Sequence, residues 1–317
     1  MPKDLSHAKR RPMPVAPPFN TLALVGNFTD PRVIDSMQLL AAHLHGRQRK
    51  VVVDAANTLD FGATPVRREP EDRLGAVVDL MVAIGGDGTL LHAARLTAAQ
   101  SIPVLGVNRG RLGFLADIGP AEMCDRVDDI LDGRFVQDHR TMLRAQLQCL
   151  GAGDRYCDAL NDVVLQKWRT GRMLDFETWI DGRFVNSHRG DGLVIATGTG
   201  STAYALSCGG PILYPGLDAL VLAPICPHTL SDRPIVVPAA STIEIRLVDR
   251  VDTDAQIICD GIALGELRCS DRLVVKPANI GVTMLHPAGH DYYRILRSKL
   301  RWGRGERVPA EDSDSAE

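Results

Sequence analysis

The residues from Val82 to Ala94 join an apolar segment, a glycine-rich turn and a helical pattern, and this order constrains the fold more than any other stretch. The apolar run from Val77 to Ile84 predicts a buried strand, and the apolar spacing from Leu90 onward predicts a helix. Three of the four residues from Gly85 to Gly88 are glycines. Bare backbone beside the free N–H groups of a helix start favours a bound phosphate.

Asp87 is the one acid in this turn. A carboxylate repels a phosphate unless it has a task of its own, such as accepting a proton from a nucleophilic hydroxyl or holding a metal ion through water. The alternative is that Asp87 only caps the helix that follows. On the residues alone, both interpretations stay open.

Composition limits the classes of protein to which the chain can belong. Its 317 residues are enough for two domains with separate cores, and 45% apolar and 24% charged residues are ordinary for a soluble globular protein. The net charge of −3 argues against a general role on nucleic acid or on a membrane surface. The seven cysteines are scattered and never spaced Cys-x-x-Cys, which indicates free thiols in a reducing compartment. We expect a cytoplasmic protein without a membrane span.

Strands alternate with helices in the first part of the chain, which predicts a mostly parallel sheet. The expected elements are strands at Thr21–Asn27, Val51–Val53, Val77–Ile84 and Ile102–Val107, and helices that begin at Pro31, near Leu90 and near Pro120. The polar segment Thr58–Gly75 is expected to be a mobile connection. Ligands of such sheets bind beyond the carboxyl ends of the strands, so Gly26, the Gly85–Gly88 turn and the turn at Asn108 are expected to border one crevice.

After about Gln137, apolar and polar residues alternate, which predicts strands. The pairs Asp181-Gly182 and Asp260-Gly261 predict tight turns. The expected organisation is a flexible leader at 1–19, an α/β domain at 20–137, a β-rich domain at 138–289, a helix at 290–303 that packs back on the first domain, and a disordered acidic tail at 304–317.

A second glycine-rich loop, from Gly198 to Ala203, formally fits the dinucleotide fingerprint. That fingerprint needs a βαβ unit, and this loop lies in β-rich surroundings, so we discount a Rossmann site here. Hydroxyls, bare backbone and an aromatic ring suit it to holding a nucleotide, whereas a polar turn that starts a short helix is the plain alternative. Its candidate residues are Thr199, Gly200, Ser201, Thr202, Ala203 and Tyr204.

Two further polar pairs lie between the glycine loops, Asn161 with Asp162 and Arg189 with Asp191. Neighbouring strand residues point to opposite faces, so Asn161 and Asp162 can serve one site only at a strand end or a bulge. The alternative for Asn161 and Asp162 is a turn that opens a strand, and the alternative for Arg189 and Asp191 is a solvated pair in a hairpin. The histidines show no metal-binding spacing, and we therefore expect no metal held by a dedicated set of side chains.

In the order in which they occur, these motifs resemble those of the ATP-dependent NAD kinases. The segments that carry the resemblance are Gly85–Thr89, Gly106–Leu115, Leu160–Val164, Arg189–Gly192, Thr199–Tyr204 and Cys208–Ser231. A Gly-Gly-Asp-Gly turn alone also occurs in lipid kinases and phosphofructokinases, but the ordered set is specific and covers Thr21 to Trp302. The resemblance implies an α/β plus all-β fold, with an N-terminal Rossmann-like α/β domain that binds ATP, a C-terminal β-sandwich-like domain that binds NAD, and a homodimer or homotetramer.

The resemblance also implies the chemistry. The γ-phosphoryl group of ATP would move to the 2′-hydroxyl of the adenosine ribose of NAD to give NADP, with Asp87 as the general base, Gly88 as its ligand-contacting neighbour and Mg²⁺ carried by ATP. The remaining implied contacts are Asn161 and Asp162 at the ribose or phosphates of the dinucleotide, with Arg172, Arg189 and Asp191 nearby, Thr202, Ala203, Tyr204 and Ser207 around its adenosine or nicotinamide end, and His92 as a further candidate.

The chain departs from the family pattern at three positions. The family usually has glutamate at Asp162, proline at Gly198 and, in many members, glutamine at Ile262. Two other functions fit part of the same motifs. A lipid kinase would need a basic amphipathic surface to dock on a bilayer, and the sequence offers none. A catalytically silent NAD-binding module would have no use for the acid at Asp87.

Overall fold

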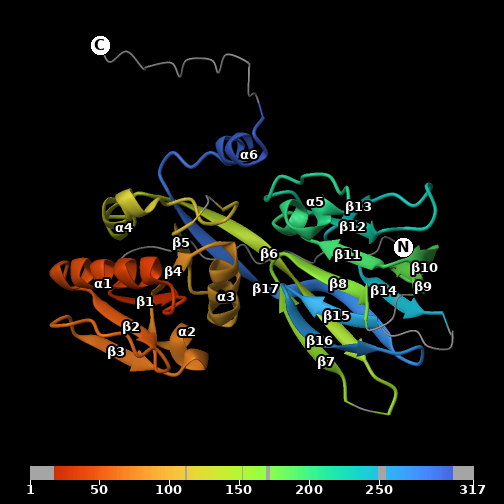
Figure 1. The fold of residues 1–317 in the computed structure, drawn as a ribbon, viewed down its shortest axis with the longest axis horizontal. Helices are drawn as coiled ribbons and strands as arrows, with labels where there is room; N and C mark the ends of the chain where they lie inside the picture. The colour runs from red at the N-terminus through yellow and green to blue at the C-terminus, as the bar shows by residue number, and fades with distance from the viewer. Residues whose placement is uncertain (1–17, 111–112, 152, 169–171, 249–254, 303–317) are drawn as a thin grey trace, which may run out of the picture.

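The computed structural model describes residues 18–110, 113–151, 153–168, 172–248 and 255–302, so most of the predicted leader and the whole acidic tail lie outside the described residues. Figure 1 shows two halves, an α/β half and a β-rich half. The long strands β6 (Phe135–Gln148) and β17 (Arg272–Pro287) run from one half into the other. This arrangement confirms the predicted α/β plus all-β fold.

The first half is built on five parallel strands in the spatial order β3, β2, β1, β4, β5. These strands are β1 (Thr21–Gly26), β2 (Lys50–Asp54), β3 (Val66–Glu69), β4 (Leu80–Gly85) and β5 (Val104–Asn108). Helices α1 (Pro31–Gly46) and α4 (Met123–Leu131) cover one face, with a buried apolar core beneath them. Helices α2 (Leu74–Val77) and α3 (Asp87–Thr97) cover the other face over a separate core. The predicted parallel sheet is therefore confirmed.

The prediction of a mobile connection over Thr58–Gly75 is wrong. Strand β3 lies within it and pairs with β2 in parallel, and a short 3₁₀ turn (Glu71–Arg73) then leads into α2. β3 is an edge strand whose residues are all partly or fully exposed. Its charged sequence therefore shows no alternation of apolar and polar residues, and a prediction based on hydrophobic periodicity does not detect this strand.

Two sheets face each other in the second half, with an apolar core between them. The six-stranded sheet has the order β13 (Ile235–Pro238), β12 (Ala219–Ile225), β11 (Gly192–Ala196), β8 (Asp162–Lys167), β15 (Ala255–Cys259), β16 (Ile262–Leu267). The opposing strands are β10 (Arg183–Gly190), β9 (Leu174–Ile180), β14 (Ile243–Leu247), β17, β6 and β7 (Arg155–Ala159). Asp181 and Gly182 both have positive φ, 50° and 76°, and form the predicted turn between β9 and β10.

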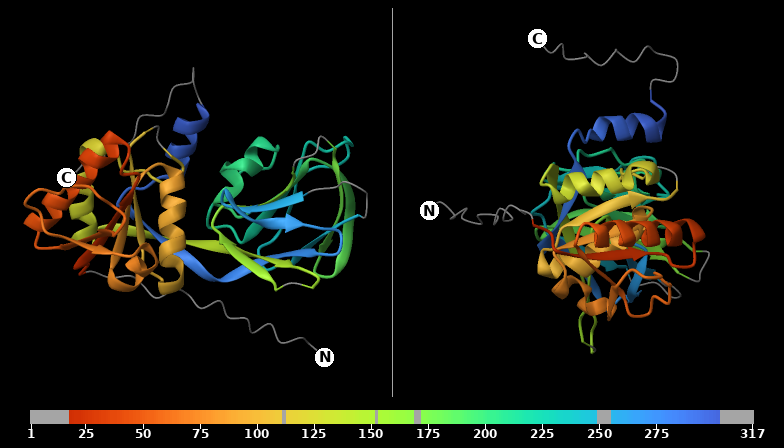
Figure 2. Two further views of the ribbon diagram at one scale, coloured as in Figure 1. Left: turned by 60° about the horizontal axis from the view of Figure 1, so that its bottom comes forward. Right: turned by 90° about the vertical axis from the view of Figure 1, so that its left-hand side faces the viewer.

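β17 links the halves because it pairs with β14 and β6 in the second half and with β5 in the first. The predicted domain boundary at residue 137 falls inside β6, and the division into domains stays a prediction. Helix α6 (Tyr292–Leu300) follows β17 and lies near the junction of the halves, as the left view of Figure 2 shows. The Nζ atom of Lys299 lies 5.6 Å from the centre of the Phe114 ring, and the hydroxyl of Tyr292 donates to the Leu213 carbonyl at 3.5 Å, so α6 contacts both halves.

Within the described residues, no helix combines the length and the apolar character that crossing a bilayer requires. All seven cysteines are free thiols, as their scattered spacing predicts.

Candidate active site

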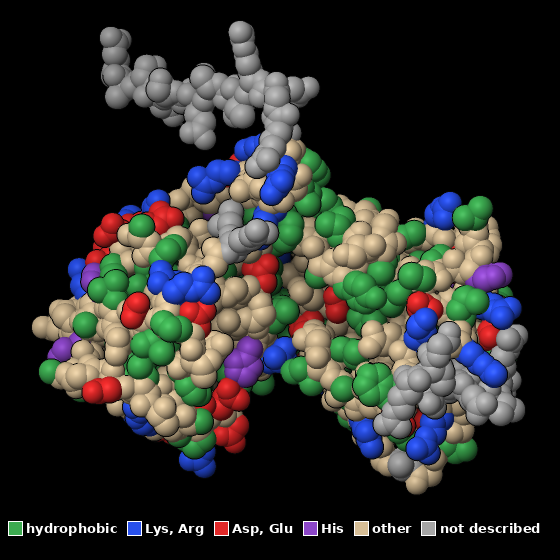
Figure 3. All heavy atoms as spheres, in the orientation of Figure 1, with side chains coloured by type: hydrophobic (Ala, Val, Ile, Leu, Met, Phe, Trp, Pro, Cys, Tyr) green, Lys and Arg blue, Asp and Glu red, His purple; other side chains and the backbone are tan. Residues whose placement is uncertain are grey.

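The glycine turn lies where β4 ends and α3 begins, beside the hollow between the two halves that is visible in Figure 3. A Cβ atom at Gly85 would come 2.3 Å from the Thr89 hydroxyl, so packing within the turn excludes a side chain there. At Gly86 and Gly88, by contrast, a Cβ atom would meet no protein atom within 4 Å. The backbone of these two residues is therefore open to a ligand at a helix N-terminus.

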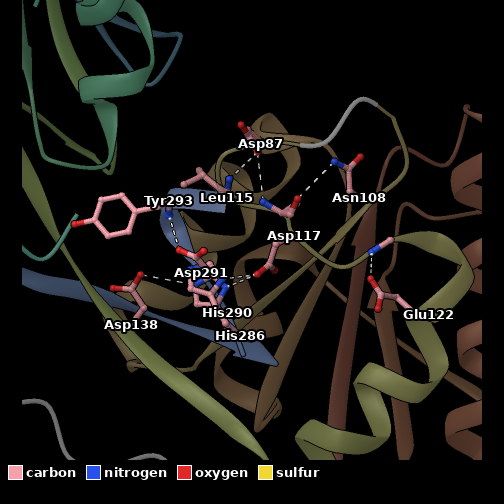
Figure 4. A network of polar contacts seen from close by, with 12 residues as sticks. Asp87, Asn108, Leu115, Asp117, Glu122, Asp138, His286, His290, Asp291 and Tyr293 are labelled. Atoms are coloured by element: carbon pink, nitrogen blue, oxygen red, sulfur yellow. Dashed lines mark hydrogen bonds and ion pairs between the residues drawn. The ribbon is translucent and has the colours of Figure 1, made fainter. Parts of the chain in front are cut away.

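The carboxylate of Asp87 binds the backbone of the turn that follows β5. Its oxygens accept the N–H groups of Leu115 at 3.1 Å, which Figure 4 shows, and of Phe114 at 2.9 Å and Ala116 at 3.4 Å. Gly113 makes room for it, because a Cβ atom there would lie 1.9 Å from Oδ1. The helix cap is Gly86 and involves no side chain, so the interpretation of Asp87 as a simple cap is wrong. A carboxylate has about four acceptor positions, which leaves one for a substrate hydroxyl.

A cavity of about 310 Å³ opens at the carboxyl ends of β1 and β4. Its walls include Gly26, Asn27, Phe28, Asp54, Asn57, Glu71, Gly88, Thr89 and His92. The prediction that Gly26 and the glycine turn border one crevice is confirmed. The Asn108 turn contacts the glycine turn instead of this cavity, because the Arg109 N–H donates to the Gly85 carbonyl at 2.9 Å. His92 lines this cavity, and its Nε2 contacts Glu71 Oε1 at 2.8 Å. A volume of this size is typical of small-molecule sites.

The structure brings Asn161 and Asp162 together with the second glycine loop. Asp162 is the first residue of β8, at the strand end that a shared site requires. The Thr197 N–H donates to the Asn161 carbonyl at 2.9 Å, and the Thr197 hydroxyl donates to the Leu160 carbonyl at 2.6 Å. A Cβ atom at Gly200 would come 2.1 Å from the Asn161 carbonyl oxygen. The two motifs are thus one packed unit.

Asp260 completes this unit, and the sequence analysis missed it. Its carboxylate accepts the N–H groups of Leu160, Asn161 and Asp162 at 2.7, 2.8 and 3.1 Å. Asp162 is only 7% exposed, and burial together with the nearby Asp260 carboxylate raises the pKa of Asp162 to about 7. No local signal could have revealed the role of Asp260, because its partners lie 98 to 100 residues earlier.

The hydroxyl-bearing residues of the second loop divide into supports and exposed groups. Ser201 is fully buried, donates to the Gly198 carbonyl at 2.7 Å and accepts the Leu213 N–H at 3.0 Å. Thr199 is 5% exposed and accepts a hydrogen bond from Arg140 at 3.1 Å. These two hydroxyls hold the loop in place. The accessible candidates are Thr202, Ala203, Tyr204 and Ser207, on the 3₁₀ turn Gly200–Thr202 and the short helix α5 (Tyr204–Ser207).

The remaining candidates lie away from this unit. Asp191 pairs with Lys167 Nζ at 2.7 Å and precedes β11, whereas Thr197 follows that strand. The five residues of β11 span about 17 Å, so Asp191 and its neighbour Arg189 are at the opposite end of the strand. Arg172 is exposed and lies two residues before β9. The fold of the chain does not gather these three residues around Asn161 and Asp162.

Sequence comparison finds two matching families along the chain. The family described as the ATP-NAD kinase N-terminal domain matches residues 24–135, and the one described as the ATP-NAD kinase C-terminal domain matches residues 160–285. An NAD kinase of Chromohalobacter salexigens is 43% identical over 288 residues, 90% of this chain and 97% of that protein. An NAD kinase of Thiobacillus denitrificans is 45% identical over 289 residues, 90% and 98% of the two chains.

Solved structures show the same architecture. The yeast NADH kinase complexed with NADH superposes with a TM-score of 0.84 and 28% identity, over 92% of this chain and 90% of that one. An NAD kinase from Archaeoglobus fulgidus in complex with ATP gives a TM-score of 0.68 and 23% identity, over 89% and 98% of the two chains, which supports the fold alone.

Proposed function

Because the chain belongs to the ATP-NAD kinase family, we propose that it transfers the γ-phosphoryl group of ATP to the 2′-hydroxyl of the adenosine ribose of NAD, giving NADP. The observation that carries the proposal is the way in which the Asp87 carboxylate is held. Three backbone N–H groups orient its carboxylate, and one acceptor position stays open beside the accessible backbone of Gly86 and Gly88.

In the proposed reaction, Asp87 accepts the proton of the 2′-hydroxyl while that oxygen forms a bond to the γ-phosphorus of ATP. The bond between the γ-phosphorus and the bridging oxygen breaks, and ADP leaves. A ribose hydroxyl is a weak nucleophile at neutral pH, and a positioned base typically contributes about 10²–10⁴ in rate. The exposed N–H groups at the start of α3 favour the negative charge of the phosphates, and holding the reacting groups in line supplies much of the remaining catalysis.

We propose the cavity at the ends of β1 and β4 as the ATP site, because Gly88 of the glycine turn and the next residue, Thr89, line its wall. Carboxylates from Asp54 and Glu71 also line it. Oxygen ligands of this kind fit Mg²⁺, which usually keeps several waters and binds one or two carboxylates together with substrate phosphates. When bound, the ion would neutralise charge on the phosphoryl group.

The dinucleotide is proposed to lie between the halves, against Asn161, Asp162 and the accessible face of the loop at Thr202–Tyr204. Asp162 and Asn161 sit where β8 begins, so both can face this space. The solved NADH complex of the yeast relative supports a dinucleotide as the bound substrate.

A homodimer or homotetramer is also proposed. Phe184 and Val185 on β10, and Ile235 and Val236 on β13, are apolar side chains 39% to 52% exposed on the edge strands of the two sheets. Exposed apolar edges of this kind favour association. Light scattering on the purified protein measures the state, and a monomer at micromolar concentration contradicts it.

The test of the function is Asp87→Asn, which keeps the size of the side chain and one acceptor oxygen. We expect NADP formation to fall by about 10²–10⁴, with NAD binding by calorimetry within about twofold of the original protein. Asp79→Asn is the matched control, because the Asp79 carboxylate also accepts two backbone N–H groups, from Asn20 and Thr21, but precedes β4 instead of following it.

Near-full activity of Asp87→Asn refutes the assignment of the base. If the unmodified protein forms no NADP from NAD, ATP and Mg²⁺ under any condition, the silent NAD-binding alternative gains instead.

A further inference from the structure

Asp117, His286 and His290 form a cluster around the buried His286 that the proposed reaction does not use directly. Oδ2 of Asp117 accepts hydrogen bonds from Nδ1 of His286 at 3.1 Å and Nδ1 of His290 at 2.7 Å (Figure 4). The two imidazole rings stack with centroids 3.8 Å apart. His286 is 1% exposed, and its Nε2 faces Oδ2 of Asp138 at 3.7 Å.

The cluster is connected on one side to Asp87. Asp117 directly follows the turn whose residues Phe114, Leu115 and Ala116 donate their N–H groups to the Asp87 carboxylate. Asp117 is therefore the anchor at the end of this turn, and His286 on β17 and His290 before α6 hold that anchor. The orientation of the Asp87 carboxylate depends on where this turn is held.

On the other side the cluster reaches the second glycine loop. Arg140 on β6 is 4% exposed, and its Nε donates to Oδ2 of Asp138 at 2.8 Å. The same guanidinium donates through Nη1 to the Thr199 hydroxyl at 3.1 Å. A continuous series of polar contacts thus runs from the turn that holds Asp87, across β17 and β6, to the loop that packs on Asn161.

Charge explains why the series is stable when buried. Burial alone would raise the pKa of Asp117, but hydrogen bonds from His286 and His290 hold it well below its usual range. Burial would likewise lower the pKa of His286, whereas its contact with Asp117 and the nearby Asp138 carboxylate raise it. A cationic His286 between two carboxylates, one of them paired with Arg140, is the arrangement that buried charges require.

We propose that Asp117 and His286 are positioning residues, which hold the turn at Gly113–Ala116 so that the Asp87 carboxylate meets the ribose hydroxyl and keep that turn in register with the loop at Thr197–Thr202. The proposal rests on the proposed function, in which Asp87 is the base. Neither residue touches substrate. Loss of either one displaces the base by a fraction of an ångström to about one ångström, which costs up to about 10²-fold in rate.

The test compares Asp117→Ala, Asp117→Asn and His286→Gln in the full chain. We expect Asp117→Ala to lower kcat about 10- to 100-fold, with the KM values for NAD and ATP within about twofold, because the substrates do not contact Asp117. Asp117→Asn keeps an acceptor oxygen for the histidines and should recover most of kcat. Asp128→Ala is the matched control, since it removes another aspartate–histidine contact, between Asp128 and His43 at 2.9 Å, on the outer side of α1 and α4.

A double-mutant cycle then separates the proposal from the function on which it rests. If Asp117 acts through Asp87, adding Asp117→Ala to Asp87→Asn should change the residual NADP formation less than threefold, measured in a long end-point assay. If Asp87→Asn alone keeps near-full activity, the proposed function has failed. The positioning proposal alone has failed in two cases in which Asp87→Asn is inactive. In the first, Asp117→Ala leaves kcat unchanged. In the second, adding Asp117→Ala to Asp87→Asn lowers the residual NADP formation by the full factor that Asp117→Ala causes alone.

Two further outcomes overturn the positioning proposal. One is that Asp117→Ala lowers only the melting temperature, while kcat measured below that temperature is unchanged. The other is a stoichiometric divalent metal in the purified protein that His286→Gln removes, because the cluster would then be a metal centre.

Discussion

Asp162 makes the stability of the fold depend on pH in a calculable way. Burial and the neighbouring Asp260 carboxylate raise its pKa to about 7, whereas an aspartate in the unfolded chain has a pKa near 3.9. Between these values the folded protein holds a proton that the unfolded chain has released, so the free energy of unfolding must fall as the pH rises. The full difference corresponds to about 4 kcal/mol, of which roughly 2.5 kcal/mol lies between pH 5 and pH 8.

Asp162→Asn keeps the shape of the side chain and removes this titration. We expect the free energy of unfolding of the variant, relative to that of the original protein, to rise by roughly 2.5 kcal/mol from pH 5 to pH 8. Urea unfolding at several pH values, followed by circular dichroism, measures it. Asp35→Asn, which changes an exposed aspartate on α1, is the control.

The reasoning is refuted if the difference between Asp162→Asn and the original protein stays constant within about 0.5 kcal/mol over this range. Asp162 would then be ionised at little cost, and the packing of β8 against Asp260 would carry no electrostatic penalty. A separate measurement of NAD binding by calorimetry shows whether Asp162→Asn has lost affinity for NAD. Such a loss is expected if Asp162 is retained for its function.

The remaining predictions concern the glycine turns and His286. In Gly113→Ala the added methyl group would come 1.9 Å from Oδ1 of Asp87, so the carboxylate must move and kcat should fall at least about tenfold. Gly110→Ala, whose methyl group meets no protein atom, is the control, and equal activities of the two variants would contradict the assignment. Gly88→Ala also meets no protein atom, so a raised KM for ATP would report the close approach of phosphate, whereas an unchanged KM would exclude it. The pKa of His286 is raised, so the contribution of its charge to the free energy of unfolding is complete below about pH 6.5 and declines as the pH rises through its folded pKa. His286→Gln should therefore lower the free energy of unfolding, measured with urea, more at pH 6 than at pH 9. An equal loss at the two pH values would count against a charged His286.

Elements whose local signals agree could be predicted from the sequence. The helix from Pro31 to Gly46 matches its prediction because Asp30 caps it, proline opens it and its apolar residues fall on one buried face. The strand before the glycine turn could be predicted for a similar reason, since β4 is almost wholly buried and reads as an apolar run. The start of that strand is Leu80 rather than Val77, because Leu74–Val77 forms α2.

Contacts between distant segments could not be predicted. The histidines look dispersed along the chain, yet folding brings His286 and His290 to Asp117, 169 and 173 residues away. Asp260 reads as a turn residue, and its φ of 45° agrees, but its carboxylate serves another strand. Spacing rules detect neighbours within one helix or strand, and these pairs come from different elements that only the sheet order brings together.

The shared strands show what joins the two halves of the candidate site. The turn that holds Asp87 belongs to the first half and Asn161 to the second, and phosphoryl transfer needs the two substrates in line. A flexible linker between the halves would not hold the two substrates in that geometry. Here β17 pairs with β6 along nearly its whole length and with β5 at Met284 and Leu285, so backbone hydrogen bonds fix the separation. The register shifts once, between Pro277 and Gly281, and at Gly281 a Cβ atom would come 2.8 Å from the Arg140 carbonyl oxygen. Arg140, at this close strand contact, also donates to the Thr199 hydroxyl, so the paired strands contact the second glycine loop directly.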